Sequence, residues 1–292
     1  MTNTVLHQCS LESNLTMERI SKRKLEQYRR SLSERDKAIL RSIHTCRFLR
    51  TDQIKRLHFR GLPTDSAVQR ATARTAAKLH NMGLIQPLKR RIGGVRAGSA
   101  SYVWTLRMAG QELLRIMQNP HTKPSRKRVF ESTFIFLAHT LAVAEVYTRL
   151  RTMENIQLMK VESEPECWRK YIADYGRNFS LKPDLYAVTA ANGYEYHYFF
   201  EVDLDTESPS RIIRKCEYYG NYYLTGTEQK RTGVFPRVVW IAPDKKRRET
   251  LSRHINEHLS DYKNLFAVIT LQELGMFMTT DSPSAVMGQA QN

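Results

Sequence analysis

Three short helical patterns in the N-terminal part constrain the fold of this chain more than any other feature. The first begins at Ser33, because a serine followed three residues later by Asp36 is typical of a capping box at a helix N-terminus. The second, TDQIKRLHF, is predicted to have Thr51 as its N-cap. The third covers about 66–81 and is expected to stop at Gly83, since glycine readily adopts the left-handed conformation that ends many helices.

Two strand-like runs, 84–89 and 101–106, follow these helices, and the basic, glycine-rich segment RRIGGVRAGSA lies between them. A further helix is expected to begin near Arg107. Three helices followed by a hairpin with a long basic loop give the element order of a winged helix-turn-helix. We therefore predict an N-terminal winged helix-turn-helix domain over 31–117, preceded by a basic extension, 1–30.

Positive charge is concentrated in this same part of the chain, whose formal net charge is +17 overall. Residues 1–130 hold 27 Lys and Arg against 8 Asp and Glu, whereas residues 131–292 hold 19 against 21. The positive electrostatic field of such a charge distribution attracts polyanions such as nucleic acids, because each phosphate that a basic side chain neutralises releases condensed counterions. We therefore expect double-stranded DNA to be the partner of the N-terminal half.

The third helix has an apolar side and a polar side on a helix wheel. The residues expected to face the core are Val68, Thr72, Thr75 and Leu79. Small alanines on the outer side, Ala73 and Ala77, would let the helix axis approach the floor of a major groove. The predicted DNA-binding side chains are Ser66, Gln69, Arg70, Arg74, Lys78 and Asn81 on this helix and Lys89, Arg90, Arg91 and Arg96 in the wing.

The C-terminal half alternates between helical and strand-like patterns. After a linker at 118–129, which holds two prolines and four basic residues, we expect helices at 130–150, 210–223 and 245–259 and strands at 157–163, 181–188, 195–204, 237–242 and 265–271. This alternation is typical of an α/β arrangement around a mixed sheet. We therefore predict an α+β protein of two domains, with the second domain at 130–278 and a disordered tail at 279–292.

Two of these strands carry acidic residues, in the segments KPDLYAV and FFEVDLDTES. If the strands pair as a hairpin, Asp184, Glu201 and Asp203 can converge, since alternate residues of a strand share one face. Carboxylates that lie close together repel each other, which raises the pKa of at least one of them unless a cation binds. Mg²⁺ or Mn²⁺, which prefer oxygen ligands, would suit such a site and can activate water for phosphodiester hydrolysis.

The hairpin resembles the PD-(D/E)xK core of restriction-endonuclease-like nucleases, in which Asp184 matches the aspartate and Glu201 the second acidic residue. Those nucleases carry a lysine two residues after the glutamate, and Asp203 occupies that position here. Lys182 lies on the right strand face to replace the lysine, and Lys215 on the next helix is a second candidate.

Glu145 on the preceding helix corresponds to the acidic residue that many of these nucleases have on their first helix. It can equally form a salt bridge with Arg149, four residues later on the same helix.

Six segments together resemble the replication-relaxation family of plasmids and other mobile elements, over about residues 32–255. They are LSERDKAILRSI, the AxxxLHNMGLI turn into the wing, GSASYVWTLRMAGQELL, HTLAVAEVY, KPDLY and FFEVDLDTES. The resemblance implies an N-terminal winged helix, a nuclease-like C-terminal half and a role in plasmid replication, relaxation or mobilisation. It says little about the chemistry of the nuclease-like half.

Three functions fit these patterns. The first is a double-stranded DNA-binding protein of a mobile element that needs no cofactor to bind DNA and whose nuclease-like domain is inactive. The second is an endonuclease or nickase that uses Mg²⁺ or Mn²⁺ with Asp184 and Glu201, and the third is a transcriptional repressor. A homodimer is expected, since helix-turn-helix proteins often bind inverted half-sites as dimers, and plasmid replication or mobilisation proteins are further expected partners.

The chain is expected to act in the cytoplasm, on plasmid or nucleoid DNA. No apolar run approaches the roughly 18 residues of a membrane span, and the start, MTNTVLHQCS, lacks the pattern of a secretory signal. The four cysteines form no CxxC pair, which fits a reducing compartment.

One motif, His254-Ile-Asn-Glu257-His258, matches the HxxEH pattern of a class of zinc peptidases. Because the helix that carries it is short and highly charged, an exposed polar helix face accounts for the same residues. We therefore do not predict a peptidase.

Overall fold

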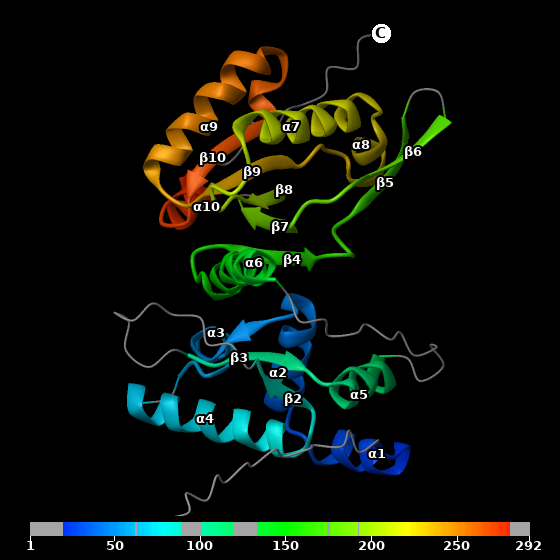
Figure 1. Cartoon of the computed structure of the whole chain (residues 1–292), viewed down its shortest axis with the longest axis vertical. Helices are drawn as coiled ribbons and strands as arrows, with labels where there is room; N and C mark the ends of the chain where they lie inside the picture. The colour runs from blue at the N-terminus through cyan, green and yellow to red at the C-terminus, as the bar shows by residue number, and fades with distance from the viewer. Residues whose placement is uncertain are drawn as a thin grey trace, which may run out of the picture.

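A computed structural model of the chain describes residues 20–61, 63–88, 101–118, 133–173, 176–191 and 193–280. The fold is α+β, as predicted, with helices packed on mixed and antiparallel sheets (Figure 1). Most of the predicted linker, the C-terminal tail from 281 and the wing residues Lys89, Arg90, Arg91 and Arg96 lie outside the described residues.

In the N-terminal part, three helices between Glu34 and Asn81 precede a hairpin, in the predicted order, with a further helix ahead of them and a short strand after the first of the three. Its elements are α1 (Lys22–Ser31), α2 (Glu34–Cys46), β1 (Leu49–Arg50), α3 (Thr51–His58), α4 (Asp65–Asn81), β2 (Ile85–Pro87), β3 (Val103–Leu106) and α5 (Met108–Gln118). β2 and β3 pair antiparallel, and β1 pairs with the other edge of β3. The apolar side of α1 packs on α5 through the buried Leu25.

Local signals set the ends of these helices. The capping box is present, since the backbone N–H of Asp36 donates to the Ser33 hydroxyl and that of Ser33 donates to the Asp36 carboxylate. Gly83 has a φ of 72°, the left-handed conformation expected after α4. The predicted Thr51 cap is wrong, because α3 already includes Thr51 and its hydroxyl instead donates to the carbonyl of Tyr102.

The C-terminal part is built on a five-stranded sheet. Its elements are α6 (Phe134–Thr152), β4 (Gln157–Ser163), β5 (Arg169–Ala173), β6 (Arg177–Leu181), β7 (Leu185–Ala191), β8 (Tyr194–Val202), α7 (Pro209–Leu224), α8 (Thr227–Thr232), β9 (Arg237–Ala242), α9 (Lys245–His258), the 3₁₀ turn η2 (Ser260–Leu265), β10 (Phe266–Thr270) and α10 (Leu274–Thr280). The strand order is β10-β9-β8-β7-β4, and the sheet is mixed as predicted. The first three of these strands are parallel, whereas β7 and β4 are antiparallel to their neighbours.

Helices cover both faces of this sheet (Figure 1). α6 and α10 pack on the face that carries Leu185 and Phe200. α7 and α9 pack on the opposite face, which carries Tyr186 and Phe199. The alternation of side chains along β7 and β8 therefore decides which residues lie beneath α7, including Glu201.

The structure differs from the prediction around 169–191. The single strand predicted at 181–188 is divided at Pro183, because proline has no backbone N–H to continue a ladder. β6 therefore ends at Leu181 and pairs with β5, while β7 begins at Leu185 and joins the main sheet.

Helix α6 connects the two halves of the chain, since it packs on α2 and α3 as well as on β4 and β8. Glu145, midway along α6, lies at this junction and is largely buried. Its carboxylate accepts hydrogen bonds from Arg56 at 2.5 and 2.8 Å, from Gln53 at 3.1 Å and from Arg50 at 3.2 Å. Arg149 is 3.3 Å away on the same helix. Burial raises the pKa of Glu145, but the bonds from Arg56 and Gln53 outweigh it and hold the pKa below 4.5.

We expect Glu145→Ala to lower the free energy of unfolding by about 2 kcal/mol, because it leaves the buried amide of Gln53 and the partly buried guanidinium of Arg56 without their acceptor. The loss should be full above pH 4.5 and should shrink as the pH falls through the lowered pKa of Glu145, where the wild-type carboxylate becomes protonated. Urea denaturation at several pH values measures both effects. The exposed Glu154→Ala is the matched control and should stay within about 0.5 kcal/mol of the wild type.

Candidate DNA-binding surface and buried acidic site

The outer face of α4 is exposed over its full length. The predicted core side of this helix is confirmed, since Thr72 and Leu79 are buried and Val68 and Thr75 are partly buried. The outer residues, all exposed, are Ser66, Gln69, Arg70, Ala73, Arg74, Ala77 and Asn81. α4 lies at one end of the long axis of the molecule, far from α7 and α9 at the other end (Figure 1).

Arg70 and Arg74 present their charges on this face, and none of the ion pairs found among the described residues involves them. Lys78 is different, because its ammonium lies 2.6 Å from the buried carboxylate of Asp36 in α2. The Lys78–Asp36 ion pair attaches α4 to α2, so Lys78 has a structural partner in addition to any role at the surface.

The acidic residues of the second half lie at one end of the β7–β8 hairpin, whose pairing places Leu185 opposite Phe200. Asp184, just before β7, accepts a hydrogen bond from the backbone N–H of Val202 at 2.8 Å and lies 3.4 Å from Nε2 of His139 on α6. Burial raises the pKa of Asp184, but the bond from His139 and the charge of Lys215 hold it below its ordinary value. The pKa of His139 is raised by the same contact.

Glu201, on β8, is completely buried beneath α7. Its carboxylate lies 2.5 Å from Nζ of Lys215 and also accepts a hydrogen bond from the hydroxyl of Tyr219. Burial raises the pKa of Glu201 to about 7, and the negative charge of Asp184 adds to this rise while Lys215 opposes it. Both carboxylate oxygens therefore have a protein donor.

The remaining predicted site residues have other partners. Asp203 is buried and forms an ion pair with Arg247 of α9, with Nε 2.6 Å from Oδ2. Lys182 is exposed, with its ammonium 4.7 Å from the centre of the Trp168 ring. Of the two candidate lysines, Lys215 therefore contacts Glu201, whereas Lys182 lies over the Trp168 ring. Glu145 belongs to the junction between the two halves.

Three residues of this site were missed in the sequence. His139 and Arg247 lie more than 40 positions from their acidic partners, so no local pattern marks them. Tyr219 follows Lys215 by four residues, which puts both on one face of α7. Tyr219 and Tyr222 are buried in the core between α7 and the sheet.

The three acidic residues predicted to bind Mg²⁺ have different protein partners among the described residues. Asp184, Glu201 and Asp203 are not gathered as ligands of one cation, since the described residues hold a single cluster of three such donors and it lies on α9. A cavity of about 30 Å³ lies beside Asp184 and His139. Because Mg²⁺ usually keeps several of its waters, binding here would require Glu201 to leave Lys215 and Tyr219.

The sequence model described as "Replication-relaxation" matches residues 40–238. Because the match covers more than half of the chain, from α2 to the start of β9, the protein belongs to the replication-relaxation family. No curated protein and no solved structure shows significant similarity to the chain. Among the described residues, no helix is long and apolar enough to cross a membrane.

We expect Lys215→Met to raise the pKa of Glu201 above 7, since the substitution removes the positive charge that opposes burial. Titration of the Glu201 side-chain carboxyl by ¹³C NMR measures the change. The matched control is Lys230→Met, which removes an exposed ammonium from α8 and should leave the titration of Glu201 unchanged. A Glu201 pKa that does not rise in Lys215→Met would contradict the assignment of this ion pair.

Proposed function

We propose that the protein is a double-stranded DNA-binding protein of a plasmid or other mobile element, acting in replication, relaxation or mobilisation. The observation that carries the proposal is the exposed outer face of α4, where Arg70 and Arg74 stand beside the small side chains of Ala73 and Ala77. Arginine and the amides of Gln69 and of Asn81 supply donors and acceptors suited to base edges and phosphates. Membership of the replication-relaxation family supports the biological setting.

The arrangement of elements in the N-terminal part supports a winged helix-turn-helix. Helix α4 takes the position of the recognition helix, following α2 and α3, and the antiparallel β2–β3 pair takes the position of the wing hairpin. In such proteins the recognition helix enters the major groove, and dimers place two such helices on inverted half-sites. We accordingly propose that two copies of this chain bind a site with two-fold symmetry.

We further propose that the nuclease-like half is inactive as a nuclease. Support comes from the partners of its acidic groups, since Glu201 is bonded to Lys215 and Tyr219 and Asp203 to Arg247. Carboxylates held by protein donors are less free to bind a cation. One observation favours the alternative of a Mg²⁺-dependent nickase: Lys215 approaches Glu201 and so supplies the lysine that the PD-(D/E)xK pattern lacks at position 203.

The DNA-binding proposal is tested by Arg70→Ala combined with Arg74→Ala. Loss of two phosphate or base contacts should weaken binding of duplex DNA by about tenfold per arginine and reduce the slope of log K against log[salt] by about 2. Fluorescence anisotropy at several salt concentrations measures both quantities. The control, Arg214→Ala with Arg253→Ala, removes the same charge from exposed positions on α7 and α9 and should change binding little. Equal effects of the two double variants would argue against α4 as the reading helix.

The inactivity of the nuclease-like half is tested with supercoiled plasmid in Mg²⁺ or Mn²⁺. We expect no nicking by the wild-type protein above the level of the Asp184→Ala and Glu201→Ala variants, because the described carboxylates already have protein donors. Metal-dependent nicking that both substitutions abolish would instead establish the nickase. Footprinting on the host element separates a replication or mobilisation factor from a transcriptional repressor, whose site would overlap a promoter.

A further inference from the structure

We infer that the last two turns of α9 form a surface binding site for a transition-metal dication of the Zn²⁺ type, with His254, Glu257 and His258 as ligands. The site is independent of the proposed DNA-binding surface, because α9 lies at the opposite end of the molecule from α4 (Figure 1). It is also separate from the buried acidic site, none of whose carboxylates takes part.

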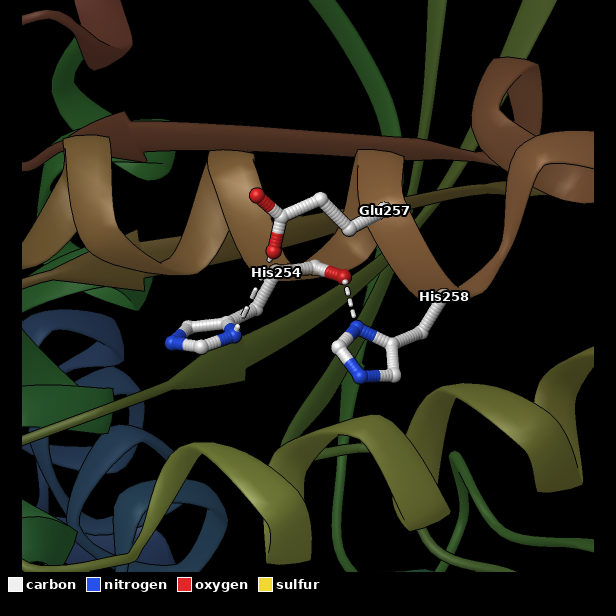
Figure 2. Close-up of side chains that lie close together, drawn as sticks. All are labelled: His254, Glu257 and His258. Atoms are coloured by element: carbon white, nitrogen blue, oxygen red, sulfur yellow. Dashed lines mark hydrogen bonds and ion pairs between the residues drawn. The ribbon is translucent and has the colours of Figure 1, made fainter.

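The three side chains are already close together. One ligand atom from each lies within 4.8 Å of the other two, and the centres of the two imidazole rings are 5.9 Å apart. Oε2 of Glu257 lies 3.9 Å from Nδ1 of His254. Figure 2 shows all three side chains grouped along one stretch of the helix. The cause is the spacing, since residues at i, i+3 and i+4 lie on one helix face.

One imidazole is held in a definite orientation. Nδ1 of His258 lies 2.9 Å from the backbone carbonyl of His254, which fixes Nδ1 as the donor in the neutral ring and leaves Nε2 as the free metal-binding nitrogen (Figure 2). Metal-binding histidines in proteins commonly donate their second ring nitrogen to a carbonyl or carboxylate in this way. The hydrogen bond therefore fixes the tautomer that leaves Nε2 available to a metal ion.

The position of the site also favours a cation. His258 is the last residue of α9, so the site lies where the unpaired carbonyls of the helix C-terminus carry partial negative charge. The basic residues that open α9, Lys245 to Arg248, lie at its other end. Glu257 adds a negative charge and is more than half exposed, so it can turn toward the metal ion.

The donor set selects the kind of metal. Two imidazole nitrogens and one carboxylate suit Zn²⁺, Ni²⁺ or Cu²⁺, whereas Mg²⁺ and Ca²⁺ prefer oxygen ligands throughout. Three protein ligands leave the fourth tetrahedral position to water. The HxxEH residues of this helix can therefore bind a metal ion without any peptidase activity.

The test uses the full chain and Zn²⁺ in competition with a chromophoric chelator. Wild-type protein should bind one Zn²⁺ ion. His254→Ala and His258→Ala should each lower the Zn²⁺ affinity by roughly 10- to 100-fold or more, since loss of even an outer-shell partner of a metal ligand has an effect of that size. Glu257→Gln should weaken binding in the same direction. The control is His44→Ala, which removes an exposed histidine from α2 and should leave the affinity unchanged.

A second readout distinguishes this site from unspecific binding to other histidines. Zn²⁺ should raise the melting temperature of the wild type and of His44→Ala but not that of the His254→Ala/His258→Ala double variant, because only a ligand of the folded state stabilises it. The metal-free melting temperatures serve to show that the variants fold. Equal Zn²⁺ affinity of the wild type and the double variant, or no Zn²⁺ binding by the wild type, would overturn the inference.

Discussion

The packing of α6 against both halves of the chain is the constraint on which the rest of the structure depends. One face of this helix covers the five-stranded sheet, and the other contacts α2 and α3. At the centre of the contact, Glu145 accepts hydrogen bonds from α3 through Gln53 and Arg56. The apolar core continues across the same contact, from Ile43 in α2 to Phe200 in β8. The orientation of α4 is therefore coupled to the sheet through buried interactions.

The buried charges of the sheet illustrate how a pattern typical of nucleases can contribute to folding. Glu201 is completely buried, and the donors Lys215 and Tyr219 offset only part of the cost of removing its carboxylate from water. Asp203, two residues later, forms its ion pair with Arg247 and so attaches α9 to the end of β8. These contacts attach α7 and α9 to the C-terminal end of the central strand β8, so the acidic residues have a structural role without catalysis.

The sequence predicted those features that depend on neighbouring residues. The capping box at Ser33, the exposed face of α4 and the limits of β4 and β9 all follow from periodicity or from local capping, and the structure agrees with them. The sequence did not predict Arg247 as the partner of Asp203 or Arg56 as the partner of Glu145. Those pairs are 44 and 89 positions apart, so only the folded topology brings them together.

The separation of surfaces along the molecule bears on how the two halves work together. α4 lies at one end of the long axis, and α7, which covers Glu201, lies beyond the sheet toward the other end (Figure 1). A duplex bound along α4 would lie on the far side of α6 from Glu201, because α6 packs between the helices α2 and α3 and the sheet. The DNA segment bound at α4 could therefore not reach Glu201 of the same chain. Cleavage at Glu201 would require a second DNA segment or a second copy of the chain. The proposed role as a DNA-binding protein with an inactive nuclease-like half agrees with this separation of α4 from α7.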